Sequence, residues 1–287
     1  MWEIVAKTMS DFSIITCVSD PEIYDRCLLE SINSTRGKHD VEIIPVINNG
    51  NHYSASNALN WGIDVAKSDV LIFSHQDVRL LDGWFDTLQN LLDEMPENWG
   101  ILGSAGIALK YRRSNIGDWG GAVEDDTVAV GTVWNSDESL SDDPYWDGAK
   151  KLTPSHAADE CLLILNKKTG LRFDTMFNGF HFYGVDMCLQ ARAAGYTVFC
   201  AHLPIIHYGK YSASLVGNNK YWVFLRYLHY KWKFRFPELY GTHMHWCADE
   251  LTSYIPVGLE SDGLSIQLKS MGLERVELTT DSDQGIA

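Results

Sequence analysis

The sequence has no long apolar run and little positive charge. No stretch approaches the roughly 18 apolar residues of a membrane-spanning helix, and residues 1–7 lack the long apolar centre of a signal peptide. The chain carries 23 Lys and Arg residues against 38 Asp and Glu, a formal net charge of -15. Because a nucleic-acid polymer requires a basic surface, such a partner is not expected. These features predict a cytoplasmic protein, and they leave room for a single bound nucleotide, which a metal and a few local groups can hold.

Paired cysteine motifs are absent too. None of the six cysteines forms a C-x-x-C pair, and several lie in apolar stretches, such as Cys161 before Leu162. Buried free thiols in a reducing compartment explain this pattern best. The composition, 45% hydrophobic and 21% charged, is that of an ordinary folded chain of 287 residues.

The first part of the chain alternates strand and helix patterns. Apolar runs predict strands over residues 12–18, 41–47 and 70–73, and helical spacing follows each one. This alternation predicts an α/β fold with a doubly wound, mainly parallel sheet. We expect a nucleotide-binding half over residues 1–95, a second half over 96–236 and a C-terminal extension over 237–287.

A polar tetrad, Ser74-His75-Gln76-Asp77, follows the buried strand at 70–73. Ligands bind beyond the carboxyl ends of strands in an open parallel sheet. His75 and Asp77 are both metal-capable side chains, so this tetrad is the first candidate site. The alternative is that Asp77 or Asp82 caps a helix over residues 84–92.

Further polar residues accompany apolar segments in the second half. A predicted apolar strand over 157–165 is entered through Asp159 and Glu160. Asp186 precedes a predicted helix over 187–194, and His207 ends an apolar run. Asp186 has an alternative interpretation as the N-cap of that helix. The aromatic and basic segment 220–236 fits either a helix packed on the domain or peripheral contact with a membrane surface.

With these segments in view, the chain from about Phe12 to Trp232 resembles the family 2 glycosyltransferases of the GT-A fold. Five segments carry the resemblance, in family order and at family-like spacing: Ser13–Asp20, Glu42–Gly50, Ala58–Ile63, Ser74–Asp77 and Phe182–Leu189. Ile206-His207-Tyr208-Gly209 also falls on the terminal histidine turn of that family. Departures occur at Leu59 in the family's Ala-Arg-Asn-x-Gly segment, at His75 in place of the first Asp of D-x-D, and at Tyr183-Gly184 in place of Glu-Asp.

The resemblance implies a metal-dependent transfer of a sugar from a nucleotide-sugar, UDP-linked by expectation, to a hydroxyl of a saccharide or glycoconjugate. Inversion at the sugar carbon is expected for a single displacement. Asp77, His75 and His207 would hold Mn²⁺ or Mg²⁺. Asp186 would be the general base, with Glu160 and Asp159 in reserve. The donor pocket would comprise Val18, Asn48, Asn49, Asn60, His75 and Gln76.

Two other functions are consistent with the residues. One is a GT-A-like protein that binds a carbohydrate or nucleotide without catalysis, because the D-x-D and base segments are altered. The other is a nucleotidyltransferase, which would need a Gly-rich phosphate loop with Lys or Arg after the first strand. Residues 19–25 contain no Gly and no Lys.

Overall fold

The structure is a computed structural model that describes residues 10–109, 127–134, 146–208, 219–236, 238–240 and 245–247. The chain separates into two compact units, one formed mainly by residues up to 211 and another that contains helix α6. Each is treated by itself. The predicted division into residues 1–95, 96–236 and 237–287 stays a prediction.

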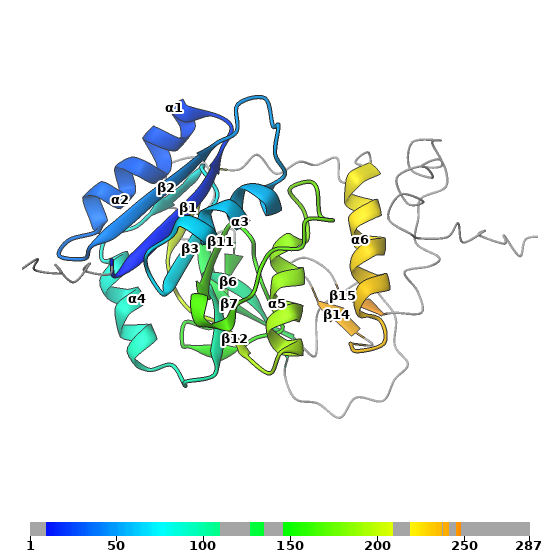
Figure 1. The fold of residues 1–287 in the computed structure, drawn as a ribbon. Coiled ribbons are helices and arrows are strands. Elements are labelled where there is room, and N and C mark those ends of the chain that lie inside the picture. Colours follow the sequence, from blue (N-terminus) through cyan, green and yellow to red (C-terminus); the bar gives the residue numbers. More distant parts are fainter. Residues whose placement is uncertain are drawn as a thin grey trace, which may run out of the picture. The chain divides into compact units, whose positions relative to one another are not determined.

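Three parallel strands form one half of a seven-stranded sheet (Figure 1). They are β1 (Phe12–Val18), β2 (Val41–Ile47) and β3 (Val70–Ser74), with β1 in the middle. β1 and β3 are almost wholly buried because apolar residues fill both of their faces. The sequence prediction is confirmed here, to the residue for the first two strands.

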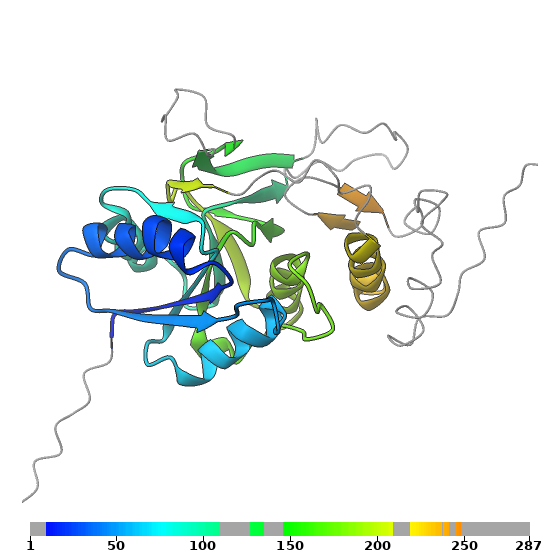
Figure 2. The same cartoon turned by 90° about the horizontal axis from the view of Figure 1, so that it is seen from above.

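Helices cover both faces of this sheet (Figures 1 and 2). The segment Pro21–Thr35, which comprises α1 (Pro21–Tyr24), a π-helical turn (Asp25–Leu29) and α2 (Glu30–Thr35), lies on one face with α4 (Trp84–Asp93). The opposite face carries α3 (Ala55–Val65) and α5 (Tyr183–Ala193). A Cβ at Gly62 would lie 2.2 Å from Ile15 Cγ2, so glycine is what allows α3 to pack this closely on β1.

The other half of the sheet is mixed. Beyond β3 the order continues β11 (Leu162–Asn166), β5 (Trp99–Gly103), β12 (Thr197–Cys200) and β9 (Thr153–Pro154). β11 is antiparallel to both β3 and β5, whereas β12 and β5 are parallel. β5 and β12 therefore run in the same direction as β1, β2 and β3, and only β11 and β9 of this sheet run against them.

A second sheet orders its strands β10 (Ala157–Ala158), β6 (Ala105–Leu109), β7 (Thr127–Trp134), β13 (Ile205–His207) and β4 (Val78–Leu80), with β8 (Trp146–Asp147) paired to β7. The predicted strand over 157–165 is wrong as a single element. β10 and β11 belong to different sheets, and Asp159-Glu160 lie in the turn between them.

The remaining elements are a 3-10 turn (Lys167–Thr169), helix α6 (Asn219–Trp232) and a small pair of strands, β14 (Glu238–Tyr240) and β15 (His245–Cys247). Among the helices of the described residues, none combines the length and apolar character needed to cross a membrane. The five cysteines whose side chains are described are free thiols, and only Cys17 is not fully buried.

Candidate metal and donor site

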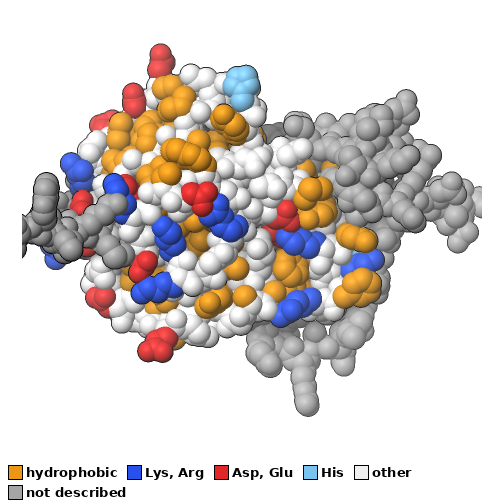
Figure 3. All heavy atoms as spheres, viewed as in Figure 1, with side chains coloured by type: hydrophobic (Ala, Val, Ile, Leu, Met, Phe, Trp, Pro, Cys, Tyr) orange, Lys and Arg blue, Asp and Glu red, His pale blue; other side chains and the backbone are white. Residues whose placement is uncertain are grey.

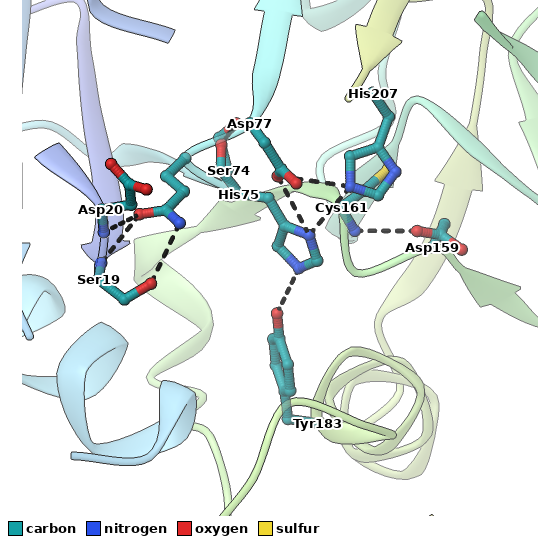
Figure 4. Close-up of polar contacts among 10 residues, drawn as sticks. Ser19, Asp20, Ser74, His75, Asp77, Asp159, Cys161, Tyr183 and His207 are labelled. Atoms are coloured by element: carbon teal, nitrogen blue, oxygen red, sulfur yellow. Dashed lines mark hydrogen bonds and ion pairs between the residues drawn. The ribbon is translucent and has the colours of Figure 1, made fainter. Parts of the chain in front are cut away.

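The first sheet brings polar chain segments to a single edge. Because β1, β2 and β3 are parallel, their carboxyl ends lie together, and the segment 75–77 leaves β3 there before β4 begins. β13 pairs antiparallel with β4 and places His207 opposite Val78. The backbone N–H of Tyr208 donates to the carbonyl of Asp77 at 2.8 Å. A histidine distant in sequence therefore joins the tetrad (Figure 4).

His75, Asp77 and His207 form a trio whose ligand atoms all lie within 4.8 Å of one another. His207 Nε2 is 3.5 Å from Asp77 Oδ1 and 3.3 Å from His75 Nδ1. The distance from His75 Nδ1 to Asp77 Oδ1 is 4.0 Å. All three side chains are partly exposed, at 24–31%, so the trio is open to an incoming ligand.

The three groups shift one another's protonation. Burial alone would raise the pKa of Asp77, but the hydrogen bond from His207 and the charges of the two histidines lower it. Burial alone would lower the pKa of His207, but Asp77 raises it through the hydrogen bond and its charge. Burial and the neighbouring His207 lower the pKa of His75. Asp77 is thus kept ionised, and His75 is kept neutral.

Two imidazoles, which bind a metal through an unprotonated nitrogen, and one carboxylate form a donor set that could hold a divalent metal ion. Mg²⁺ prefers a near-octahedral shell of oxygen ligands, of which this trio supplies one side chain. The structure thus brings together the three residues named from the sequence as metal ligands, and their role as ligands stays a prediction.

The other predicted donor-pocket side chains are held by the chain itself. Gln76 Oε1 accepts from the N–H groups of Ser19 and Asp20, both at 2.9 Å, and its Nε2 donates to Ser19 Oγ at 3.1 Å. Gln76 therefore fixes the loop that follows β1, at the edge where a donor would bind.

Asn48 is buried and closes the loop after β2 in a similar way. Its Nδ2 donates to the Tyr53 carbonyl at 2.9 Å, and its Oδ1 accepts from Tyr53 N–H at 2.8 Å. Asn60 makes the same two-point contact with the backbone of Phe173. The Val18 carbonyl accepts from Asn48 N–H at 2.7 Å, while Asn49 is exposed. The amides of Asn48 and Asn60 are therefore bound to this chain's backbone, whereas Asn49 lies at the surface.

Two carboxyl groups reach the same region from the turn between β10 and β11. The charge of Asp159 acts on both His75 and His207, and its Oδ1 accepts from Cys161 N–H at 2.9 Å. Glu160 Oε2 accepts from Gly184 N–H at 3.0 Å. Burial and the charge of Asp159 raise the pKa of Glu160 to about 8. Glu160 is therefore mainly protonated at neutral pH, which disfavours it as a general base.

Asp186 lies inside α5, because the helix begins at Tyr183 rather than at the predicted Met187. Its side chain is fully buried, and Oδ2 accepts from Gln190 Nε2 at 2.7 Å. The helix N-cap is Phe182, so the alternative that Asp186 caps the helix is wrong. The capping alternative for Asp77 and Asp82 is wrong as well, since α4 begins after Gly83.

Sequence reasoning did not select Tyr183 as a site residue. Its hydroxyl oxygen lies 2.9 Å from His75 Nε2, on the side of the imidazole opposite the trio (Figure 4). The available signal was the departure at positions 183 and 184, where Tyr-Gly stands in place of the family's acidic pair.

The surface around these elements is mixed in charge. On the face seen in Figure 3, Lys and Arg side chains are interspersed with Asp and Glu side chains, and hydrophobic side chains lie among them. The described exposed hydrophobic residues include Ile47 at the end of β2, Tyr53 in the loop that follows it and Trp61 on α3.

Comparisons with known proteins identify similar chains. A family profile described as "Glycosyltransferase like family" matches residues 13–226. The protein "ATP synthase subunits region ORF 6" of Fuscovulum blasticum is 28% identical over 204 residues, which cover 69% of this chain and 76% of that protein.

Two solved structures are similar as well. The mannosyltransferase PcManGT from Pyrobaculum calidifontis, in complex with GDP-Man and Mn²⁺, matches with a TM-score of 0.52 at 10% identity, over 94% of this chain and 77% of its own. GalNAc-T7 with UDP, GalNAc and Mn²⁺ matches with a TM-score of 0.49 at 11% identity, over 93% of this chain. This chain spans 55% of the length of that second structure. At 10% identity, the mannosyltransferase match shows a shared fold.

Proposed function

The chain belongs to the glycosyltransferase-like family and has the GT-A fold, and from this premise we propose that it transfers a sugar from a nucleotide-sugar to a hydroxyl acceptor with the help of a divalent metal ion. One observation carries the metal part of this proposal. His75, Asp77 and His207 converge at the carboxyl edge of β3, with their ligand atoms within 4.8 Å of one another. That edge is where ligands of open α/β sheets bind.

His75, Asp77 and His207 would hold the ion, with Mn²⁺ favoured over Mg²⁺ by the two imidazoles. A bound divalent ion would supply positive charge to the diphosphate that leaves the sugar. The chain's part is to present Asp77 ionised and His75 neutral, which the pKa directions of both groups support. Gln76 would keep the loop after β1 in the position needed beside the donor.

The acceptor hydroxyl must lose a proton as it attacks the sugar carbon, and a carboxylate is the usual base. Asp159 is the base that we propose. Its side chain is partly exposed, and its charge reaches both histidines of the trio. Asp186, the base implied by the family segment, is fully buried and accepts a hydrogen bond from Gln190. A single displacement with Asp159 as base would invert the sugar carbon.

The donor is proposed to be a UDP-sugar, held by Asn49 and by backbone groups near Val18. Because the similar mannosyltransferase structure contains GDP-Man, GDP-sugars are the first alternative donors to compare with UDP-sugars. The acceptor is proposed to be a saccharide or glycoconjugate. Cytoplasmic location and peripheral membrane contact through residues 220–236 stay predictions, and co-sedimentation with anionic vesicles tests the second.

The decisive experiment measures donor binding and turnover in the same preparations. UDP- and GDP-sugars are screened by thermal shift with and without Mn²⁺, and the released nucleotide is then quantified with candidate saccharides. A donor at about 100 times its dissociation constant should add about 2.7 kcal/mol of stability. Asp77→Asn should abolish the Mn²⁺-dependent part while keeping the fold.

Three outcomes would contradict the proposal or part of it. If Asp77→Asn bound the donor with Mn²⁺ as the wild type does, the metal site would be misassigned. If a nucleotide-sugar bound but no nucleotide was released with any acceptor, a binding protein without catalysis would be the better account. Transfer of a nucleotidyl group would point to the nucleotidyltransferase alternative.

A further inference from the structure

Tyr183 contacts a residue of the metal trio without belonging to it. Its hydroxyl oxygen lies 2.9 Å from His75 Nε2 (Figure 4). The other ring nitrogen of His75, Nδ1, lies 3.3 Å from His207 Nε2 and 4.0 Å from Asp77 Oδ1. One edge of the His75 imidazole therefore faces Tyr183, and the other edge faces Asp77 and His207.

A neutral imidazole carries its proton on one of its two nitrogens. If Nε2 carries the proton, it donates to the Tyr183 oxygen, and Nδ1 presents a lone pair toward Asp77 and His207. Metal-ligating histidines generally have their second nitrogen hydrogen-bonded in this manner, which fixes both the tautomer and the ring orientation.

The chain holds Tyr183 rigidly. The residue is 3% exposed, it begins α5, and its ring meets that of Phe173 edge-on at 5.7 Å between centroids. The next backbone N–H, that of Gly184, donates to Glu160.

His75 is held at a second point by the same turn that carries Glu160. Its backbone N–H donates to the carbonyl of Cys161 at 2.9 Å. The turn over residues 159–161 therefore contacts both the backbone of His75 and the helix that carries Tyr183. His75 is fixed at its backbone by the turn and at its ring by Tyr183.

We propose that Tyr183 is a positioning residue for the metal site, which accepts the Nε2–H of His75 and so directs Nδ1 to the ion. This inference rests on the proposed metal role of the trio. It assigns a function to a tyrosine at a position where the resembling family carries an acidic residue. Tyr183 would contact neither the ion nor the donor.

The test removes one oxygen atom. Tyr183→Phe keeps the ring that packs on Phe173 and loses only the hydroxyl. Mn²⁺ is titrated without any nucleotide, and free Mn²⁺ is followed by its electron paramagnetic resonance signal. The variant should bind Mn²⁺ roughly 10- to 100-fold more weakly. Tyr196→Phe, beyond the opposite end of α5, is the matched control and should bind as the wild type does.

A second measurement does not depend on the Tyr183→Phe variant. The ¹⁵N chemical shifts of the His75 ring, assigned by their loss in His75→Gln, should show Nε2 protonated and Nδ1 unprotonated before metal is added. The opposite tautomer would overturn the inference, whether or not Tyr183→Phe folds.

The outcomes separate this inference from the proposed function. If the wild-type chain binds Mn²⁺, Asp77→Asn abolishes this binding and Tyr183→Phe leaves it unchanged, the positioning role is refuted and the metal site stands. If the wild-type chain bound no Mn²⁺, with or without donor, both the positioning role and the metal part of the proposed function would fall.

Discussion

Replacing Glu160 with glutamine should change how the stability of the protein depends on pH. The pKa of the Glu160 carboxyl group is raised from its ordinary value of 4.5 to about 8, mainly by burial and to a smaller extent by the charge of Asp159. The N–H groups of Gly184 and Phe182 offset part of this increase. Glutamine retains an oxygen that can accept from Gly184 N–H, but it does not titrate.

The direction of this pH dependence follows from proton binding by Glu160. Between about pH 4.5 and pH 8, the folded chain keeps the Glu160 proton and the unfolded chain releases it. The free energy of unfolding therefore falls as pH rises through this window, by up to about 1.4 kcal/mol per pH unit from this group. This contribution is fully present below pH 4.5 and is lost by about pH 8. Glu160→Gln lacks it, so the variant should gain stability relative to the wild type as pH rises.

Urea unfolding of both proteins at several values between about pH 5 and pH 8 measures this difference. The two stability curves should diverge with increasing pH. Asp159→Asn serves as the matched control: it removes the neighbouring charge, so the pKa of Glu160 should fall and its contribution should end at a lower pH. Parallel curves for the wild type and Glu160→Gln would refute the reasoning, and Glu160 would return as a candidate general base.

Two further predictions concern Asp159, in the turn before β11, and Gly184, in the first turn of α5. If Asp159 is the base, Asp159→Asn should lower turnover in the nucleotide-release assay by about 10²- to 10⁴-fold and leave donor affinity nearly unchanged. If only Asp186→Asn lost turnover in that assay, Asp186 would be the base instead. Gly184→Ala should cost about 1–3 kcal/mol of stability in urea unfolding, because its Cβ would lie 2.6 Å from Glu160 Cβ. Mn²⁺ affinity should fall in the same variant because Tyr183 moves with its neighbour, and wild-type stability would contradict the clash.

The first half of the fold could be predicted from the sequence because its signals are local. Largely apolar runs bounded by turn residues predicted β1 and β2 to the residue. The second half depends on pairings that no local pattern encodes. Nothing in residues 162–166 indicates that β11 runs antiparallel to β3. The early start of α5 follows Phe182, whose φ of 64° lies in the left-handed region that few non-glycine residues adopt.

The site was predictable in its chemistry and less so in its contacts. His75 and Asp77 follow a buried strand, which is a local signal, but His207 joins them only because β13 pairs with β4. The polar residues Asn48, Asn60 and Gln76 stand at the expected edge, yet their amides bind backbone groups of this chain. A sequence does not distinguish a polar side chain that awaits a ligand from one that closes a loop.

Glu160 and the departures from the family pattern at positions 75, 183 and 184 are linked by contact. A side chain at 184 would meet the Cβ of Glu160 at 2.6 Å and its Cα at 3.1 Å, so this packing leaves no room for the acidic residue that the family segment carries there. Glu160 instead brings a carboxyl group to the same helix start from the turn before β11. At position 183, the tyrosine hydroxyl meets the histidine that replaces the first Asp of D-x-D. A reversion at position 184 alone would therefore disturb Glu160 before it restored a carboxylate.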